Sequence, residues 1–118
     1  MTLITTPRPT NRKADLTSRF FQVLSDATRV RIVELLLEDE RNVGELVARL
    51  GLQQGRVSTH LACLKWCGFI QTRREGKYVY YRITDGRVRA LVQLAQGLLA
   101  DHAGEVASCL RLAGEASC

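Results

Sequence analysis

Residues 43–68, VGELVARLGLQQGRVSTHLACLKWCG, predict two helices joined by a tight turn. The first helix is short and ends at Gly51, and the second begins near Gln54 and ends at Gly68. The core-facing stripe of the second helix consists of apolar residues at helical spacing, namely Val57, Leu61 and Leu64. Two helices connected by a short turn that contains glycine form the helix-turn-helix pattern.

Directly after this pair the hydrophobic pattern changes from helical spacing to alternation. Residues 69–74, FIQTRR, and residues 77–83, KYVYYRI, alternate as strands do, and Glu75-Gly76 joins them as a hairpin. A helix-turn-helix followed by such a hairpin predicts a winged helix, a mainly α fold with a small β-hairpin wing.

Further helical patterns flank this unit on both sides. A helix is predicted over 15–24, Ser25-Asp26 offers an N-cap for a helix over 27–38, and one long helix is predicted over 88–110. A single short domain leaves apolar stripes of the terminal helices uncovered, so we expect a homodimer with these helices at the interface. We expect one domain over 13–110, with flexible segments at 1–12 and 111–118.

The charge balance indicates a polyanionic partner. Lys and Arg number 17 against 12 Asp and Glu, which gives a net charge of +5. Nucleic acid is the first candidate and an anionic membrane surface the second. The N-terminus lacks the apolar core of a signal peptide, and no segment has the length of a membrane-spanning helix. We therefore expect a cytoplasmic protein that keeps its thiols reduced and has no membrane partner.

The sequence offers no arrangement typical of an enzyme. Ser58 and His60 lie two apart on a helix and point apart, so they cannot act as nucleophile and base. Cys63 and Cys67 are separated by three residues, not by the two of thiol oxidoreductases. No glycine-rich phosphate loop is present, and we expect no organic small-molecule substrate.

Three segments together resemble the ArsR/SmtB family of winged-helix repressors. They are LSDATRVRIVELL at 24–36, LGLQQGRVSTHLACLKWCGFI at 50–70 and RREGKYVYYRI at 73–83, in the family's order and spacing. The likeness covers roughly residues 15–100 and is far more specific than a lone helix-turn-helix. It implies a repressor that binds double-stranded operator DNA and leaves it when a metal ion binds. The family also contains members that have no metal site.

The polar face of the second helix and the wing are the expected DNA contacts. In the major groove we expect Gln54, Arg56, Ser58, Thr59 and His60, with Arg56 as the base reader. In the wing we expect Arg73, Arg74 and Lys77 to contact phosphate or the minor groove, and Lys65 to reach the backbone. The alternative for these charges is a solvated face without a partner.

The four cysteines are read as metal ligands, redox switches or core residues, and least of all as a disulfide framework. Cys63 and Cys67 lie four apart on the predicted helix, so both sulfurs lie on one face. Arg56 and His60 share that stripe, which is separate from the core stripe. A pair of thiols off the core face favours a role as metal ligands or redox switch over a role as core residues.

The segment LACLKWCG at 61–68 is similar to that of the family's cadmium- and lead-responsive members. The likeness implies that Cys63 and Cys67 bind the ion together with a third thiolate from the partner subunit, for which Cys109 is the match. Cys109 can equally be an interface core residue. Cys118 is either a tail thiol or a fourth sulfur.

Three sulfurs suit cadmium, lead or mercury, because soft thiolates select soft ions, whereas zinc prefers a fourth ligand. Two alternatives stay open. One is a thiol-redox sensor on the same fold, and the other is a DNA-binding winged helix without an effector.

Overall fold

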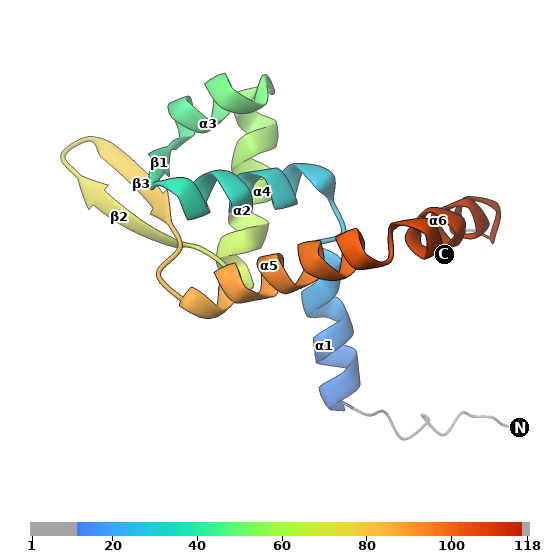
Figure 1. Cartoon of the computed structure of the whole chain (residues 1–118). Coiled ribbons are helices and arrows are strands. Elements are labelled where there is room, and N and C mark those ends of the chain that lie inside the picture. Colours follow the sequence, from blue (N-terminus) through green and yellow to red (C-terminus); the bar gives the residue numbers. More distant parts are fainter. Residues whose placement is uncertain (1–11, 117–118) are drawn as a thin grey trace, which may run out of the picture. The chain divides into compact units, whose positions relative to one another are not determined.

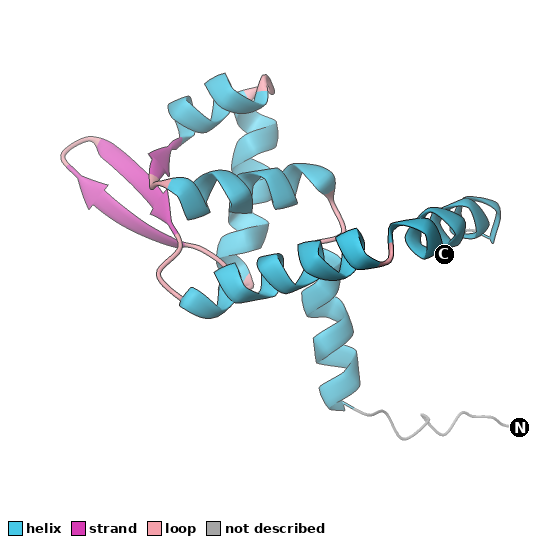
Figure 2. Cartoon of the chain, viewed as in Figure 1, coloured by secondary structure: helices cyan, strands magenta, loops and turns pink. Residues whose placement is uncertain are grey.

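Most of the described chain is helical, and the first part of the chain also forms one small sheet (Figure 1, Figure 2). The computed structural model describes residues 12–116, with side chains up to residue 110. The chain divides between Thr84 and Asp85 into two compact units. The first unit contains α1 (Arg12–Val23), α2 (Ala27–Glu38), β1 (Arg41–Asn42), α3 (Val43–Leu50), α4 (Gln54–Trp66), β2 (Gln71–Glu75) and β3 (Tyr78–Arg82).

Capping residues determine where α2 begins and where α3 begins and ends. Asp26 is the N-cap of α2, and its side chain accepts from the backbone N–H of Thr28 and of Arg29. Asn42 and Glu45 form a reciprocal capping box at the start of α3, and Gly51 ends that helix with a φ of 67°. These findings confirm the predicted N-cap and the predicted helix end at Gly51.

The wing is a hairpin within a sheet of three antiparallel strands in the order β1-β3-β2. The hairpin register runs from Gln71 opposite Arg82 to Glu75 opposite Tyr78. β2 begins at Gln71, later than the predicted residue 69, because the N–H of Phe69 donates to the carbonyl of Leu64 at the end of α4 and not to β3. Phe69 and Ile70 are buried in the core. The strand β1 was not predicted, since its two residues are too few to show alternation.

The core of the first unit lies between α2, α3, α4 and the start of the wing. The apolar stripe predicted for α4 is confirmed, since Val57, Leu61 and Leu64 are all buried. Ile32, Val33 and Leu36 of α2 and Leu46 of α3 join them. This packing turns the remaining face of α4 toward solvent.

The second unit consists of α5 (Gly86–Asp101) and α6 (Ala103–Ala116). The single helix predicted over 88–110 is therefore wrong, because the chain breaks at His102, where φ is −123° and ψ is 33°. Gly104 follows within the first turn of α6 and weakens helix continuation there. The predicted flexible segment 1–12 lies outside the described residues except Arg12. In the predicted tail, the backbone of 111–116 belongs to α6.

Membrane insertion was not predicted from the sequence. Between residues 12 and 116, no helix has both the length and the apolar character needed to cross a bilayer.

Candidate nucleic-acid interface and thiol site

The N-terminal half of α4 presents a polar, exposed face. The side chains on it are those of Gln54, Arg56, Ser58 and Thr59. The hydroxyl of Thr59 donates to the carbonyl of Gly55 at 2.9 Å, so it can offer only lone pairs and its methyl group to a partner. Gln53 precedes the helix as its N-cap but makes no side-chain capping bond. This face has the donors and acceptors that a base-reading helix requires.

His60 is half-buried and is held by a residue that sequence reasoning missed. The Nε of Arg29 donates to the Nδ1 of His60 at 3.1 Å, and its Nη1 donates to the carbonyl of Val23 at 3.3 Å. One guanidinium thus joins the end of α1, α2 and α4. Arg29 lies inside the quoted segment 24–36, but nothing in that pattern identifies His60 as its partner.

The exposed cations predicted for DNA contact lie on α4 and the wing. Lys65 is in the last turn of α4, Arg74 is on β2, and Lys77 is in the hairpin turn. The ammonium of Lys77 lies 5.4 Å from the centre of the Tyr78 ring, a cation–π distance. All three side chains are exposed.

Arg73 differs from these cations, because a carboxylate of the same chain already binds it. Its Nε donates to Oε1 of Glu40 at 3.0 Å, and its Nη2 bonds to the same oxygen. Its Nη1 lies 3.4 Å from Oε2 of Glu75. The hydrogen bond from Arg73 lowers the pKa of Glu40 below its ordinary value of 4.5. Glu40 was not among the predicted site residues.

The two thiols on α4 lie together, as the four-residue spacing predicted. Cys63 is half-buried in the last turns of the helix. The last helical residue is Trp66 and Cys67 is the exposed C-cap. Gly68 follows with a φ of 82° and ends the helix as predicted. The Cys67 N–H still donates to the Cys63 carbonyl at 3.2 Å, which keeps the two residues one turn apart.

The electrostatics of the pair disfavour the thiolate form in the absence of an ion. Partial burial of the Cys67 thiol raises its pKa above 9.0, and the neighbouring Cys63 adds to the rise through its charge and a hydrogen bond. The positive charge of Arg29 acts in the opposite direction. A cation that replaced the protons would relieve the repulsion between the two sulfurs.

The remaining predicted ligands are elsewhere in the chain. Cys109 is exposed on α6 of the second unit, and Cys118 lies outside the described residues. The described part of the chain holds no group of three or more His, Cys, Asp and Glu side chains that could bind a metal ion. Within the described residues the structure thus brings together Cys63 and Cys67 as a pair.

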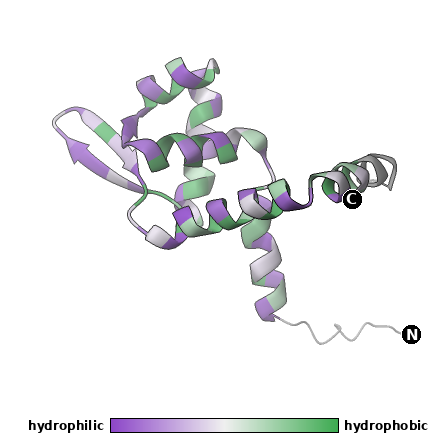
Figure 3. Ribbon diagram, viewed as in Figure 1, coloured by the Kyte–Doolittle hydropathy of each residue, from purple (hydrophilic) through white to green (hydrophobic). Residues whose placement is uncertain are grey.

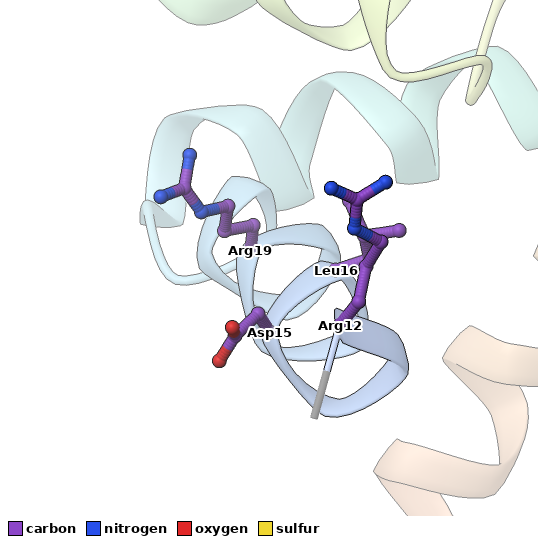
Figure 4. Close-up of a pocket in the computed structure, with 4 residues that line it drawn as sticks. All are labelled: Arg12, Asp15, Leu16 and Arg19. Atoms are coloured by element: carbon purple, nitrogen blue, oxygen red, sulfur yellow. The ribbon is translucent and has the colours of Figure 1, made fainter. Parts of the chain in front are cut away.

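A separate hollow of about 410 Å³ lies on the first helix. Figure 4 shows that its lining side chains all project from α1, namely Arg12, Asp15, Leu16 and Arg19. Among the described residues one helix supplies the lining, so this is a hollow on a helix surface. It belongs to the uncovered face of α1, where Leu16 is 62% exposed.

Known proteins share both the sequence pattern and the fold. A family model described as bacterial regulatory protein, arsR family, matches residues 26–72. A protein of Streptomyces lividans described as a probable mercury resistance operon repressor is 45% identical over 101 residues, 86% of this chain and 81% of that protein. The HTH-type transcriptional regulator CmtR of Mycobacterium bovis is 42% identical over 84 residues, 70% of this chain and 71% of that protein.

A solved structure extends the likeness to the fold. It is the solution structure of the homodimeric winged helix-turn-helix DNA-binding domain of Mb0332 from Mycobacterium bovis. It has a TM-score of 0.69 and 33% identity, and the match covers 85% of this chain and 94% of that one.

The winged helix and its exposed polar face define a DNA-binding transcription regulator and not an enzyme. The chain belongs to the arsR family of bacterial regulatory proteins.

Proposed function

We propose that this protein is a cytoplasmic homodimeric repressor that binds operator DNA and is released when a soft heavy-metal ion binds its cysteine thiolates. The observation that carries the proposal is that Cys63 and Cys67 lie one helical turn apart at the end of α4, the helix proposed to read DNA. An ion bound there is connected directly to the DNA-reading element.

The DNA interface consists of α4 and the wing. The major groove receives Gln54, Arg56, Ser58, Thr59 and His60, and Arg56 is the base reader because arginine pairs bidentately with guanine. Lys65, Arg74 and Lys77 contact phosphates. Arg73 was predicted to join them, but its guanidinium is held by Glu40, so we leave it out of the interface.

A second copy of the chain covers the apolar faces of the terminal helices. Large apolar side chains at least half exposed occur on α1, α5 and α6, namely Leu16, Phe21, Leu94, Leu98, Leu99 and Leu110. Figure 3 shows hydrophobic residues recurring along α5. Burying such surface stabilises by about 25 cal/mol per Å². The Mb0332 domain is homodimeric, which supports the same state here.

The ion is soft, because the ligands are sulfur. Cys63 and Cys67 supply two thiolates, Cys109 of the partner subunit is proposed to supply the third, and Cys118 can assist. Cadmium, lead and mercury all suit three thiolates, whereas zinc prefers four ligands. The description of the Streptomyces lividans relative favours mercury as the first ion to test.

The redox alternative uses the same cysteines. The thiolate is the form that reacts with oxidants, and partial burial together with the neighbouring Cys63 raises the pKa of Cys67, which disfavours that form at this thiol. A metal ion displaces the proton itself, so it does not need a low pKa in the free protein.

The coupling to DNA follows from where the pair lies. A dimer reads two half-sites about one helical turn apart, so the two recognition helices must keep a fixed separation. A bond from the end of α4 to the other subunit changes that separation. A coupling of a few kcal/mol is enough to shift operator occupancy tenfold or more.

The test adds mercury, cadmium and lead in turn to the protein–DNA complex under an excess of a phosphine reductant. We expect a sulfur-to-metal charge-transfer band and release of the DNA at one equivalent per site. A control without metal, freed of the reductant, receives hydrogen peroxide. Release by peroxide together with no response to any of the three ions would contradict the proposal and support the redox alternative.

Mixed dimers then identify the origin of the third thiolate. One subunit carries Cys109→Ser, and the other carries Cys63→Ser with Cys67→Ser. If Cys109 acts across the interface, this dimer retains one complete site and half of the band. If Cys109 acts within its own chain, the mixed dimer has no complete site.

A further inference from the structure

The side chain of Arg73 crosses one strand of the sheet. Arg73 lies at the centre of β2, opposite Tyr80 of β3 in the hairpin register. Its guanidinium carbon is 4.9 Å from the centre of the Tyr80 ring and its nitrogens bond to Glu40. Glu40 precedes β1, which flanks β3 on its other side. The side chain therefore connects β2, across β3, to the link between α2 and β1.

The charge of Arg73 is neutralised where it lies. Glu40 and Glu75 both contact the guanidinium, and the side chains of Arg73 and Glu40 are only 34% and 29% exposed. The hydrogen bond to Glu40 also raises the pKa of Arg73 above its ordinary value. Glu40 and Glu75 occupy three of the five N–H donors of this guanidinium and offset its charge, so Arg73 attracts a phosphate less strongly than an uncompensated cation does.

The next residue on the strand is placed differently. Successive side chains of a strand point to opposite faces, so Arg74 projects away from the face that Arg73 crosses. Arg74 is exposed, as is Lys77 in the turn between the strands. The two neighbouring arginines therefore have separate surroundings and can have separate roles.

We propose that Arg73 is a positioning residue, and that its bond to Glu40 fixes the wing so that Arg74 and Lys77 can reach DNA. The inference rests on the proposed phosphate contacts of those two cations. In this role the acidic residue Glu40 strengthens the binding of a polyanion, although its own charge repels one.

The sign of the effect of Glu40→Gln tests this role. Removing a negative charge near DNA ordinarily strengthens binding, and freeing Arg73 to contact phosphate would strengthen it further. If Glu40 fixes the wing, Glu40→Gln instead weakens binding roughly threefold to tenfold. Glu105→Gln on α6 makes the same chemical change at an exposed residue and serves as the control.

Affinity is measured by fluorescence anisotropy with a duplex from the region upstream of the protein's own gene and with a random-sequence duplex. We expect Glu40→Gln and Arg73→Ala to weaken binding to both duplexes by similar factors. The variant that combines Glu40→Gln with Arg73→Ala should bind no more weakly than Arg73→Ala alone, because the two residues act as a pair. The exchanged pair, Glu40→Arg with Arg73→Glu, should recover most of the affinity.

Two readouts separate this inference from the wing contacts on which it rests. Arg74→Ala should reduce the magnitude of the slope of log affinity against log salt by about 1.8 per dimer, because each subunit loses one phosphate contact worth about 0.9. An unchanged slope would remove those wing contacts and overturn the inference with them. If Arg74→Ala behaves as expected but Glu40→Gln binds more tightly than the wild type, the positioning role alone is overturned.

Discussion

Arg29 on α2 holds His60 on α4, the helix proposed to read DNA, through a hydrogen bond of 3.1 Å from its Nε to the imidazole Nδ1. Because Nδ1 accepts this bond, the proton of the neutral ring is on Nε2. His60 can therefore present a donor at Nε2, which suits the acceptor atoms of guanine or adenine in the major groove. The same guanidinium bonds to the carbonyl of Val23 at the end of α1.

The first prediction is that Arg29→Lys destabilises the fold. A lysine ammonium cannot reproduce the forked bonds of a guanidinium to two helices. We expect the free energy of unfolding, measured in urea, to fall by about 1–2 kcal/mol. Arg31→Lys is the matched control, since Arg31 is exposed on the same helix. Equal stability of the two variants would show that the bonds of Arg29 contribute nothing measurable.

The second prediction separates base reading from phosphate binding. Arg56→Ala should reduce discrimination at one operator position by about 1–3 kcal/mol while leaving binding to random DNA nearly unchanged. Lys77→Ala should weaken binding to both kinds of DNA alike and flatten the salt dependence. Competition between operator and random duplexes measures both effects. Unaltered base preference in Arg56→Ala would remove Arg56 from the proposed interface.

The third prediction concerns the N-cap of α2. The backbone N–H of Arg29 is the main cause that lowers the pKa of Asp26 below 3.8, so its ionised form is favoured in the folded state. This contribution to stability is present above pH 3.8 and is lost as the pH falls through the lower folded-state pKa. Asp26→Ala should lower the thermal midpoint by a few degrees at neutral pH and progressively less in acid.

The control for this prediction is Asp26→Asn. Asparagine caps a helix as well as aspartate but does not titrate. Its thermal midpoint should therefore stay close to that of the wild type at neutral pH. A penalty for Asp26→Ala that is the same at neutral pH and below pH 3.8 would argue against the ionised cap.

The fourth prediction concerns the dimer. Leu98 is 62% exposed on α5, and a buried glutamate in its place would be costly at an interface. We expect Leu98→Glu to sediment as a monomer at micromolar concentration and to bind the operator much more weakly. Gln93→Glu places the same charge at an exposed position of the same helix and should remain dimeric. Two variants with the wild-type sedimentation coefficient would exclude Leu98 from the interface.

The sequence predicted the features that depend on local patterns. The stripe Val57, Leu61 and Leu64, the N-cap Asp26 and the helix end at Gly51 are each determined by neighbouring residues. The alternation of apolar and polar residues over 69–74 and 77–83 likewise located the hairpin. The spacing of Cys63 and Cys67 placed the two residues one turn apart, and Gly68 ends the helix as predicted.

Features that depend on residues far apart in the chain were not predictable in this way. Arg73 was assigned to DNA because its charge is visible in the sequence, whereas its partner Glu40 lies 33 residues away. The bond of Arg29 to His60 spans 31 residues and leaves no periodic signal. The break at His102 was missed because apolar spacing does not register a single non-helical residue.

The most direct test of the proposed metal switch is the release of DNA by mercury in Cys63→Ser and in Cys67→Ser, each fully reduced. We expect both variants to bind DNA as the wild type does without metal, but to lose the charge-transfer band and the metal-driven release. Ala62→Ser, an exposed position on the same helix, should respond as the wild type does. Metal-driven release that persists in both cysteine variants would contradict the account and place the sensor elsewhere in the chain.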